Sequence, residues 1–339
     1  MSKPIFIAIS LLGLIICITG CSAPQPKPLP QSTEPPQSVE PPKPVPPLPE
    51  PQPQPPQPEP PPPEPEPVLP EPQPAPPKPQ PPPPEPEPLV DFHDKCAPLL
   101  TQFVDSSGKV DYSSIKKNKR LLNKPLDDFE HLDPNLYKTW PKEDQIAFWI
   151  NAYNIELIKI IADNYPIQSS RILRLFWPPN SIRHIKGLWT DFKFLVMDEQ
   201  FTLTEVQQRF LEKFDEPRIW LAVCNASASS PPLRNEPYYG RKLYQQLDDQ
   251  TAKFLASPKG FKIDKAAKTV YLSAIFEPDW FGSRFLAKYA TDKKFKDQPP
   301  AVRAVLNFIT NYIPKDDARF LEIENYSVDF LAYDWTLNE

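Results

Sequence analysis

The clearest pattern of apolar positions runs from Pro141 to Tyr165. Apolar side chains recur there at steps of three and four residues, which predicts an α-helix. Further apolar residues fill its other faces, so we expect this helix to be buried nearly all round. Two amides, Asn151 and Asn154, lie one turn apart on it. A buried amide needs hydrogen-bond partners, so they either tie loops to the helix or line a pocket.

The remaining pattern predicts shorter helices and a few strands. Thr202 and Glu205 have the spacing of a capping box at the start of one of these helices. We predict these further helices at 94–103, 113–123, 203–214, 240–256 and 299–312. We predict a buried strand at 218–224, a hairpin of strands 260–263 and 269–272, and a last strand at 328–333. Helices outnumber strands, which favours an α+β fold: one helix-rich globular domain with a small mixed or antiparallel sheet.

The N-terminus has the pattern of an export signal. Lys3 precedes an apolar run from Ile5 to Ile18, which is too short to span a bilayer. The sequence Ile18-Thr19-Gly20-Cys21 resembles the lipobox of bacterial lipoproteins. This resemblance implies a signal peptide over residues 1–20 and lipid on Cys21, which would attach the protein to a membrane. An uncleaved N-terminal anchor and a plain secretory signal are the alternatives.

The residue after that cysteine bears on the location. Ser22 follows Cys21. By resemblance to the sorting of enterobacterial lipoproteins, the absence of aspartate at this position favours the outer membrane. We therefore predict a lipid-anchored protein of the cell envelope with its globular part in the periplasm.

A proline-rich spacer, residues 21–89, follows the leader. Residues 24–88 contain 35 prolines in 65 positions. Proline fixes φ and lacks the backbone donor, so helix and sheet are both excluded there. We predict a disordered spacer rich in extended polyproline II, which would hold the globular part away from the membrane. The alternative is a ligand for an aromatic-lined proline-binding groove.

Residues 90–339, which we call the head, are long enough for one domain with a sizeable core. Four lysines and nine glutamates precede residue 90, so the head carries equal numbers of basic and acidic side chains. A neutral head has no electrostatic attraction to nucleic acid, and we expect no nucleic-acid partner. No histidine or cysteine pair has metal-ligand spacing and no glycine-rich phosphate loop occurs, so we predict neither a metal nor a cofactor.

Cys224 is the one position where the head sequence suggests chemistry. It closes the predicted strand 218–224 and precedes a loop of small residues, whose N–H groups could lower the pKa of the thiol and bind an oxyanion. A thiol enzyme needs a base, and His184 is our candidate. The alternative is a buried cysteine that packs as a small apolar residue. Export also permits a disulfide with Cys96, which the sequence does not decide.

Several sequence motifs resemble the domain-of-unknown-function family 547. They span residues 92–338, and are found at 108–112, 147–154, 164–167, 224–227, 230–233 and 333–338. The resemblance implies a shared fold and little about activity. Members of the family commonly have a second cysteine at the position of Ser230. They often have Ile-Glu-His where this chain has Val206-Gln207-Gln208, and glutamine cannot transfer a proton near neutral pH.

Two hypotheses follow from these observations. The first is an envelope lipoprotein whose head binds a partner protein or a cell-wall component without catalysis. The second is a thiol-dependent hydrolase or acyl transferase with Cys224 as its nucleophile. The glutamines favour the first hypothesis. Both use the same candidate pocket residues: Asn151, Tyr153, Asn154, Gln207, Gln208, Asn225, Ser227, Ser230, Asp334 and Trp335.

Overall fold

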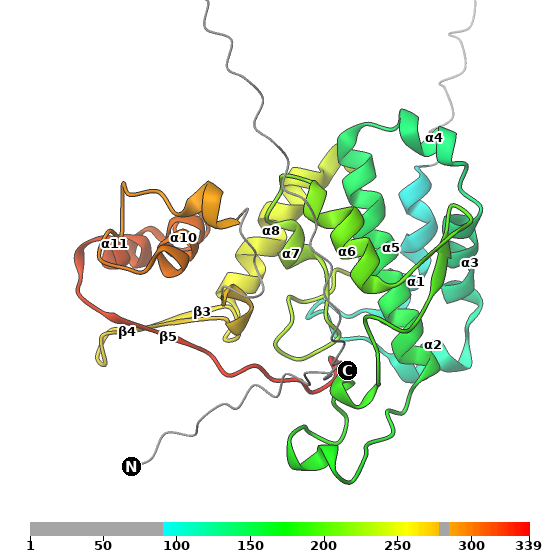
Figure 1. Ribbon diagram of the computed structural model, residues 1–339, viewed down its shortest axis with the longest axis horizontal. Helices are drawn as coiled ribbons and strands as arrows, with labels where there is room; N and C mark the ends of the chain where they lie inside the picture. Colours follow the sequence, from blue (N-terminus) through cyan, green and yellow to red (C-terminus); the bar gives the residue numbers. More distant parts are fainter. Residues whose placement is uncertain (1–90, 278–284) are drawn as a thin grey trace, which may run out of the picture. The chain divides into compact units, whose positions relative to one another are not determined.

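The computed structural model describes residues 91–277 and 285–339 (Figure 1). Contacts divide the chain after Pro81, and every described residue belongs to the second unit, Pro82–Glu339. The leader, Cys21 and most of the spacer fall in the first unit. All three lie outside the described residues, so what the sequence predicts for them stays a prediction. None of the helices in the described ranges combines the length and apolar character needed to cross a bilayer.

Helix α5, Lys142–Asp163, is the central element of the larger hydrophobic cluster. Helices of the N-terminal half pack around it, as Figure 1 shows. Its residues are buried on nearly every face, including Trp149, Tyr153 and Ile161. The predicted buried helix is therefore confirmed. The surrounding helices are η1 Phe92–Cys96, α1 Ala97–Phe103, α2 Tyr112–Lys117, α3 Arg120–Glu130, α4 Pro134–Thr139 and α6 Leu203–Arg209.

A second hydrophobic cluster contains the C-terminal elements. Its sheet has the order β3-β4-β5, with β3 antiparallel to β4 and β5 parallel to β4. This small mixed sheet and the predominance of helices confirm the α+β prediction. The second cluster includes parts of α7 Ile219–Ala222 and α8 Leu243–Ala256, which also contribute to the first cluster, together with β3 Phe261–Asp264, β4 Thr269–Leu272, η6 Ala274–Phe276, α10 Pro300–Ile309, α11 Lys315–Ile323 and β5 Ser327–Phe330. The 3-10 helix η5, Gly240–Lys242, contacts α5. Residues 285–289 are also helical.

The predicted strand at 218–224 is wrong. The segment forms α7, in which the N–H of Leu221 donates to the carbonyl of Arg218 and the N–H of Val223 to that of Ile219. The burial of the segment is as predicted. A short apolar run between hydrophobic clusters is buried in either conformation, so its pattern does not distinguish helix from strand.

The helix predicted at 113–123 is interrupted at Asn118. That residue has φ −129° and ψ 75°, which is not helical, and α2 and α3 lie on either side of it. Asparagine readily leaves the helical conformation. The break also lets each short helix bury its own apolar residues, Ile115 on α2 and Phe129 on α3.

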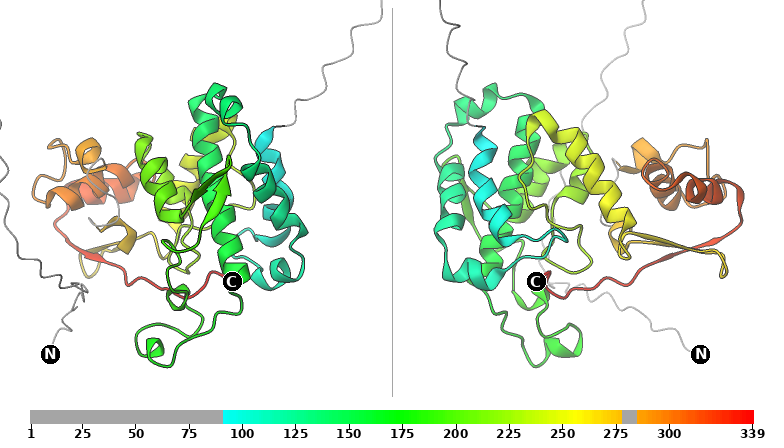
Figure 2. Two further views of the ribbon diagram at one scale, coloured as in Figure 1. Left: turned by 45° about the vertical axis from the view of Figure 1, so that its right-hand side comes forward. Right: turned by 180° about the vertical axis from the view of Figure 1, so that it is seen from behind.

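Most other boundaries are close to the prediction, and the capping box of Thr202 and Glu205 is present. The α-helix that follows is shorter than predicted, because it ends at Arg209 and continues as the 3-10 helix η4, Leu211–Lys213. The last strand ends at Phe330 rather than 333. Helices α4 and α11 and the hairpin β1 Phe194–Val196 with β2 Glu199–Phe201 were not predicted. After β5 an extended segment returns toward the α2 end of the helical group (Figure 2).

Candidate functional site

The segment after α7 is held to the central helix by Asn154. The Asn154 side chain accepts a hydrogen bond from the N–H of Cys224, at 2.8 Å, and donates one to the carbonyl of Ala222, at 3.0 Å. Asn154 is buried, so these bonds satisfy both its donor and its acceptor groups. Of the two roles considered for this amide, the structure supports tying a loop to the helix.

Asn151 has the same role and lies one turn earlier on α5. Its amide donates to the carbonyl of Tyr238, at 2.8 Å, and accepts from the N–H of Tyr238, at 2.9 Å. It also lies 3.3 Å from Nδ1 of His93, a buried side chain whose Nε2 is 3.5 Å from Asp144. Burial lowers the pKa of His93, and this favours the neutral imidazole. This histidine therefore serves the interior network.

The sulfur of Cys224 is surrounded by hydrogen-bond donors. The N–H of Ala226 is 3.2 Å from Sγ, and the Ser230 hydroxyl and the Asn338 amide are each 3.6 Å from it. Hydrogen bonds to sulfur favour the thiolate, but burial has the larger effect and raises the pKa of Cys224. Cys224 as a whole is 4% exposed. It is consequently a protonated interior group near neutral pH.

The C-terminal segment closes over this loop. The N–H of Ala228 donates to the carbonyl of Thr336, at 2.7 Å, and the N–H of Asn338 to that of Ala226, at 3.3 Å. Asn338 also accepts from the Tyr112 hydroxyl, at 2.8 Å. Four of the motifs that resemble family 547, at 108–112, 147–154, 224–227 and 333–338, thus meet around Cys224.

Gly108 allows the closest approach in this cluster. It has φ +84°, and a Cβ placed on it would lie 2.5 Å from Cβ of Pro232. A side chain there would meet both a strained backbone and an occupied space. The turn before 109–112 therefore depends on glycine.

No hydrogen bond or ion pair among the described residues joins His184 to Cys224. Nε2 of His184 is 2.8 Å from the carbonyl of Pro178, on its own loop. Cys96 and Cys224 are both free and buried, so the disulfide left open by the sequence is not present. Burial also raises the pKa of Cys96. The structure thus brings neither of the expected partners to Cys224.

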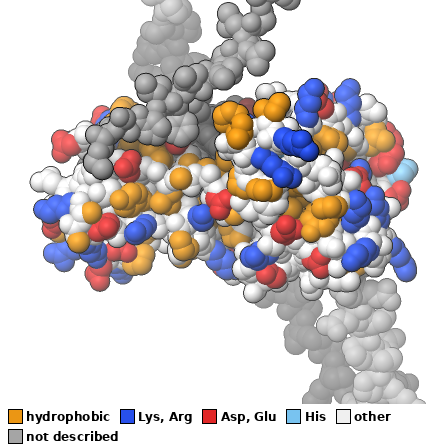
Figure 3. Space-filling model, turned by 90° about the horizontal axis from the view of Figure 1, so that it is seen from below, with side chains coloured by type: hydrophobic (Ala, Val, Ile, Leu, Met, Phe, Trp, Pro, Cys, Tyr) orange, Lys and Arg blue, Asp and Glu red, His pale blue; other side chains and the backbone are white. Residues whose placement is uncertain are grey.

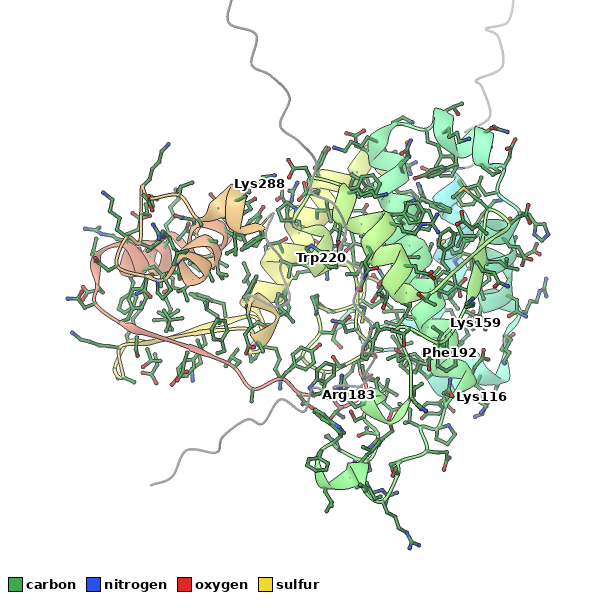
Figure 4. All side chains as sticks on the ribbon, viewed as in Figure 1. Lys116, Lys159, Arg183, Phe192, Trp220 and Lys288 are labelled. Atoms are coloured by element: carbon green, nitrogen blue, oxygen red, sulfur yellow. The ribbon has the colours of Figure 1, made fainter. Side chains whose placement is uncertain are left out.

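A pocket of about 420 Å³ lies beside this junction. Figure 4 labels Arg183 of η3 (Ile182–His184) and Trp220 of α7, two of its lining residues. Three indoles and four polar or charged side chains line it, together with apolar residues. Its described lining comprises Arg183, Trp189, Gln207, Glu212, Trp220, Val223, Asn225, Pro231, Ile275 and Trp335. We call this the tryptophan pocket.

Contacts between neighbours fix several side chains of the tryptophan pocket. The Arg183 guanidinium lies 4.8 Å from the ring centre of Trp177 and 4.9 Å from that of Trp335, so it packs against both indoles. The Gln207 amide donates to the Tyr153 hydroxyl, at 3.1 Å. Tyr153 thus orients Gln207 from the buried side.

Of the residues predicted from the sequence, Gln207, Asn225 and Trp335 line the tryptophan pocket. Gln208 is exposed and is not among the lining residues. Asp334 accepts from the N–H of Thr336 and lies 3.5 Å from Lys259; these hydrogen bonds lower its pKa.

Ser227 and Ser230 line a different cavity, of about 470 Å³, together with Lys109, Lys259 and Asn338. The Ser227 hydroxyl is 2.7 Å from that of Tyr333, and burial raises the pKa of Tyr333 to about 12. The predicted residues therefore divide between two cavities and the interior, rather than lining one pocket.

Sequence reasoning missed Arg183, Trp189, Glu212 and Trp220. These residues come from three separate regions of the chain, and no local motif marks them. All seven tryptophans of the chain follow residue 139. This abundance indicates a packed core but does not predict which indoles line a pocket. Among the described residues, no group of histidine, cysteine and acidic side chains is arranged to hold a metal ion.

Comparison with known proteins gives one match. Residues 137–255 match the DUF547 family. The description of this family is "protein of unknown function". The matched DUF547 region runs from α4 to α8, which is narrower than the resemblance predicted at 92–338. It includes the Cys224 loop and some of the residues that line the tryptophan pocket. No match was found among curated proteins or among solved structures.

Proposed function

We propose that this protein is an envelope lipoprotein whose head binds a cell-wall component in the tryptophan pocket without catalysis. Two neighbouring features support the proposal. Cys224 is buried and protonated, and the pocket beside it is lined by indoles, amides and charged side chains. Its volume falls within the usual range for sites that bind small molecules.

The lining of the pocket suits a ligand with both apolar faces and polar edges. Indole rings offer flat apolar faces. Gln207 and Asn225 offer amide donors and acceptors, while Arg183 and Glu212 offer charges of both signs. Sugar rings combine C–H faces with many hydroxyl and amide groups. Cell-wall glycan is therefore the component that we propose.

The thiol-enzyme alternative gains no support from these contacts. A nucleophilic cysteine needs a thiolate and a base within hydrogen-bond reach. Burial raises the pKa of Cys224, and its hydrogen-bond partners are Ala226, Ser230 and Asn338, none of which has a basic side chain. We therefore do not propose a catalytic role for this thiol.

Co-sedimentation with purified peptidoglycan sacculi tests the proposal. Gln207→Ala removes a pocket amide and should lower the affinity by about tenfold, the usual value of one buried hydrogen bond. Gln208→Ala is the matched control, since this neighbour is exposed and does not line the pocket. Equal binding by both variants, or no binding by the natural chain, would overturn the proposal.

A further inference from the structure

The chain between α5 and β1 carries an exposed apolar tip. Ile172, Leu175 and Phe176 are 71%, 80% and 70% exposed, the three largest values among the big hydrophobic side chains that the structure describes. All three lie at or beside the 3-10 helix η2, Leu173–Leu175. In Figures 1 and 2 this segment projects from the end of the helical group in every view. We call residues 170–179 the apolar loop.

The charged residues next to the apolar loop in the sequence are all basic. Residues 164–190 contain Arg171, Arg174, Arg183 and Lys186 and no acidic residue. No ion pair within the described ranges involves Arg171 or Arg174, and both are exposed. Figure 3 looks at the head from the side of this loop and shows hydrophobic and basic side chains next to each other. The loop is thus apolar and locally cationic in a head that is neutral as a whole.

The backbone at the tip is already hydrogen-bonded. The N–H groups of residues 174–177 donate to carbonyls of Ser170, Ile172 and Leu173. A segment entering the interface of a bilayer must satisfy its backbone groups internally, because water is scarce there. At the base of the loop, Trp177 packs against the Arg183 guanidinium, 4.8 Å from its ring centre. The tip is therefore presented on an anchored turn.

We propose that the apolar loop docks the head onto an anionic phospholipid surface. Ile172, Leu175 and Phe176 would enter the boundary between headgroups and acyl chains, while Arg171 and Arg174 would contact the headgroup phosphates. Short apolar segments flanked by arginine bind membrane surfaces in this way. The charged residues over 164–190 are all basic and complement an anionic lipid surface, and the exposed apolar tip fits the boundary between its headgroups and acyl chains. This inference uses other residues than the tryptophan pocket, except for Arg183, and holds whether or not the pocket binds glycan.

Vesicle co-sedimentation with a chain of residues 22–339 tests the docking proposal. Removal of residues 1–21 excludes the leader and Cys21 from the measurement. The hydrophobic contacts of the described fold are made between residues of 91–339, so the shortened chain retains them. We expect binding to vesicles containing phosphatidylglycerol and much weaker binding to pure phosphatidylcholine vesicles. High salt should weaken the binding, because it screens the arginines.

Two variants of this chain separate the apolar from the cationic contribution. Replacing Ile172, Leu175 and Phe176 by serine should reduce partitioning by at least about tenfold. Arg171→Gln with Arg174→Gln should also reduce it by at least about tenfold, at about 1 kcal/mol for each basic residue near an anionic surface. These side chains are exposed, so we expect unchanged thermal unfolding.

Matched controls come from elsewhere on the head. Ile323→Ser removes a side chain that is 65% exposed on α11, and Lys124→Gln with Lys138→Gln removes two exposed charges on α3 and α4. Both controls should bind vesicles as the natural chain does. Failure of the natural chain to bind anionic vesicles, or equal losses in controls and loop variants, would overturn the proposal. Self-association that is abolished by the serine variant would also overturn it, in favour of a second copy of the chain.

Discussion

The sulfur of Cys224 shows how a single residue can organise a site without reacting in it. Its three hydrogen-bond donors come from its own loop and from the C-terminal segment. Its backbone N–H is held by Asn154. Burial raises the pKa of the thiol. At the residue scale, Cys224 is therefore a structural contact between segments distant in the sequence.

Alkylation of the native chain should reveal this protected state. We expect slow iodoacetamide labelling of Cys224 from pH 5 to 9, with no thiolate step below about 8.5, the ordinary thiol pKa. Cys96 is also buried and free, and peptide mass spectrometry distinguishes the two sites. The denatured chain, which should label rapidly at both, is the control. Rapid labelling of Cys224 in the folded chain would contradict its structural role.

Glu156 makes the stability of the head depend on pH. Its side chain is buried in the middle of α5, and Oε2 has no hydrogen-bond partner among the described residues. Burial is the main cause that raises its pKa to about 8. The folded head holds this proton more tightly than the unfolded chain does. The contribution of Glu156 to stability is therefore full below about pH 4.5 and is lost as the pH rises to about 8.

Glu156→Gln should remove this pH dependence. We expect the variant to be more stable than the natural chain at pH 8, by about 2 kcal/mol or more, with a smaller difference at pH 5. Denaturant unfolding at the two pH values measures the difference. Glu324→Gln changes an exposed glutamate and is the control. A difference that grows toward low pH would refute the assignment.

At the scale of elements, α5 positions the rest of the site through its two asparagines. Asn151 holds the segment of Tyr238, and Asn154 holds the junction after α7. The tryptophan pocket receives Val223 and Asn225 from that junction. The pocket therefore depends on hydrogen bonds that are made in the interior.

Asn154→Ala should destabilise the head by about 2 to 4 kcal/mol, because it leaves two buried backbone groups at Ala222 and Cys224 without partners. Thermal or denaturant unfolding measures the loss. Asn311→Ala removes an asparagine that bonds the carbonyls of Asn307 and Phe308 near the end of α10. This control should cost less than about 1 kcal/mol. Comparable losses of stability in both variants would contradict the role of Asn154 in holding the junction after α7.

The predictability of these elements follows from their length and their neighbours. Helix α5 could be predicted because its apolar pattern persists for six turns. The seven apolar-rich residues 218–224 could not, since burial between two clusters permits helix or strand. The burial of Asn154 in the sequence pattern allowed two roles, holding a loop to the helix or lining a pocket, and did not decide between them. The tryptophan pocket could not be predicted from the sequence, because Arg183, Trp220 and Trp335 are distant in the chain and come together only in the tertiary fold.

At the scale of the whole molecule, a lipid anchor at Cys21 and a proline-rich spacer would together determine where the head acts. They lie outside the described residues, and their roles rest on the sequence. If Cys21 carries lipid, Cys21→Ser should move the protein from the membrane fraction to a soluble fraction after export or leave it with an uncleaved leader. Fractionation of cells and intact-mass analysis measure both effects. An unmodified Cys21 in the natural chain would contradict the anchor.

The proposed glycan-binding function of the head is tested most directly by saturation-transfer NMR with soluble peptidoglycan fragments and the chain of residues 22–339. We expect saturation transfer to the fragment that weakens in Gln207→Ala and persists in Gln208→Ala and Cys224→Ser, with fragment spectra unchanged over hours. Product signals that disappear in Cys224→Ser, or the absence of any transfer, would contradict it.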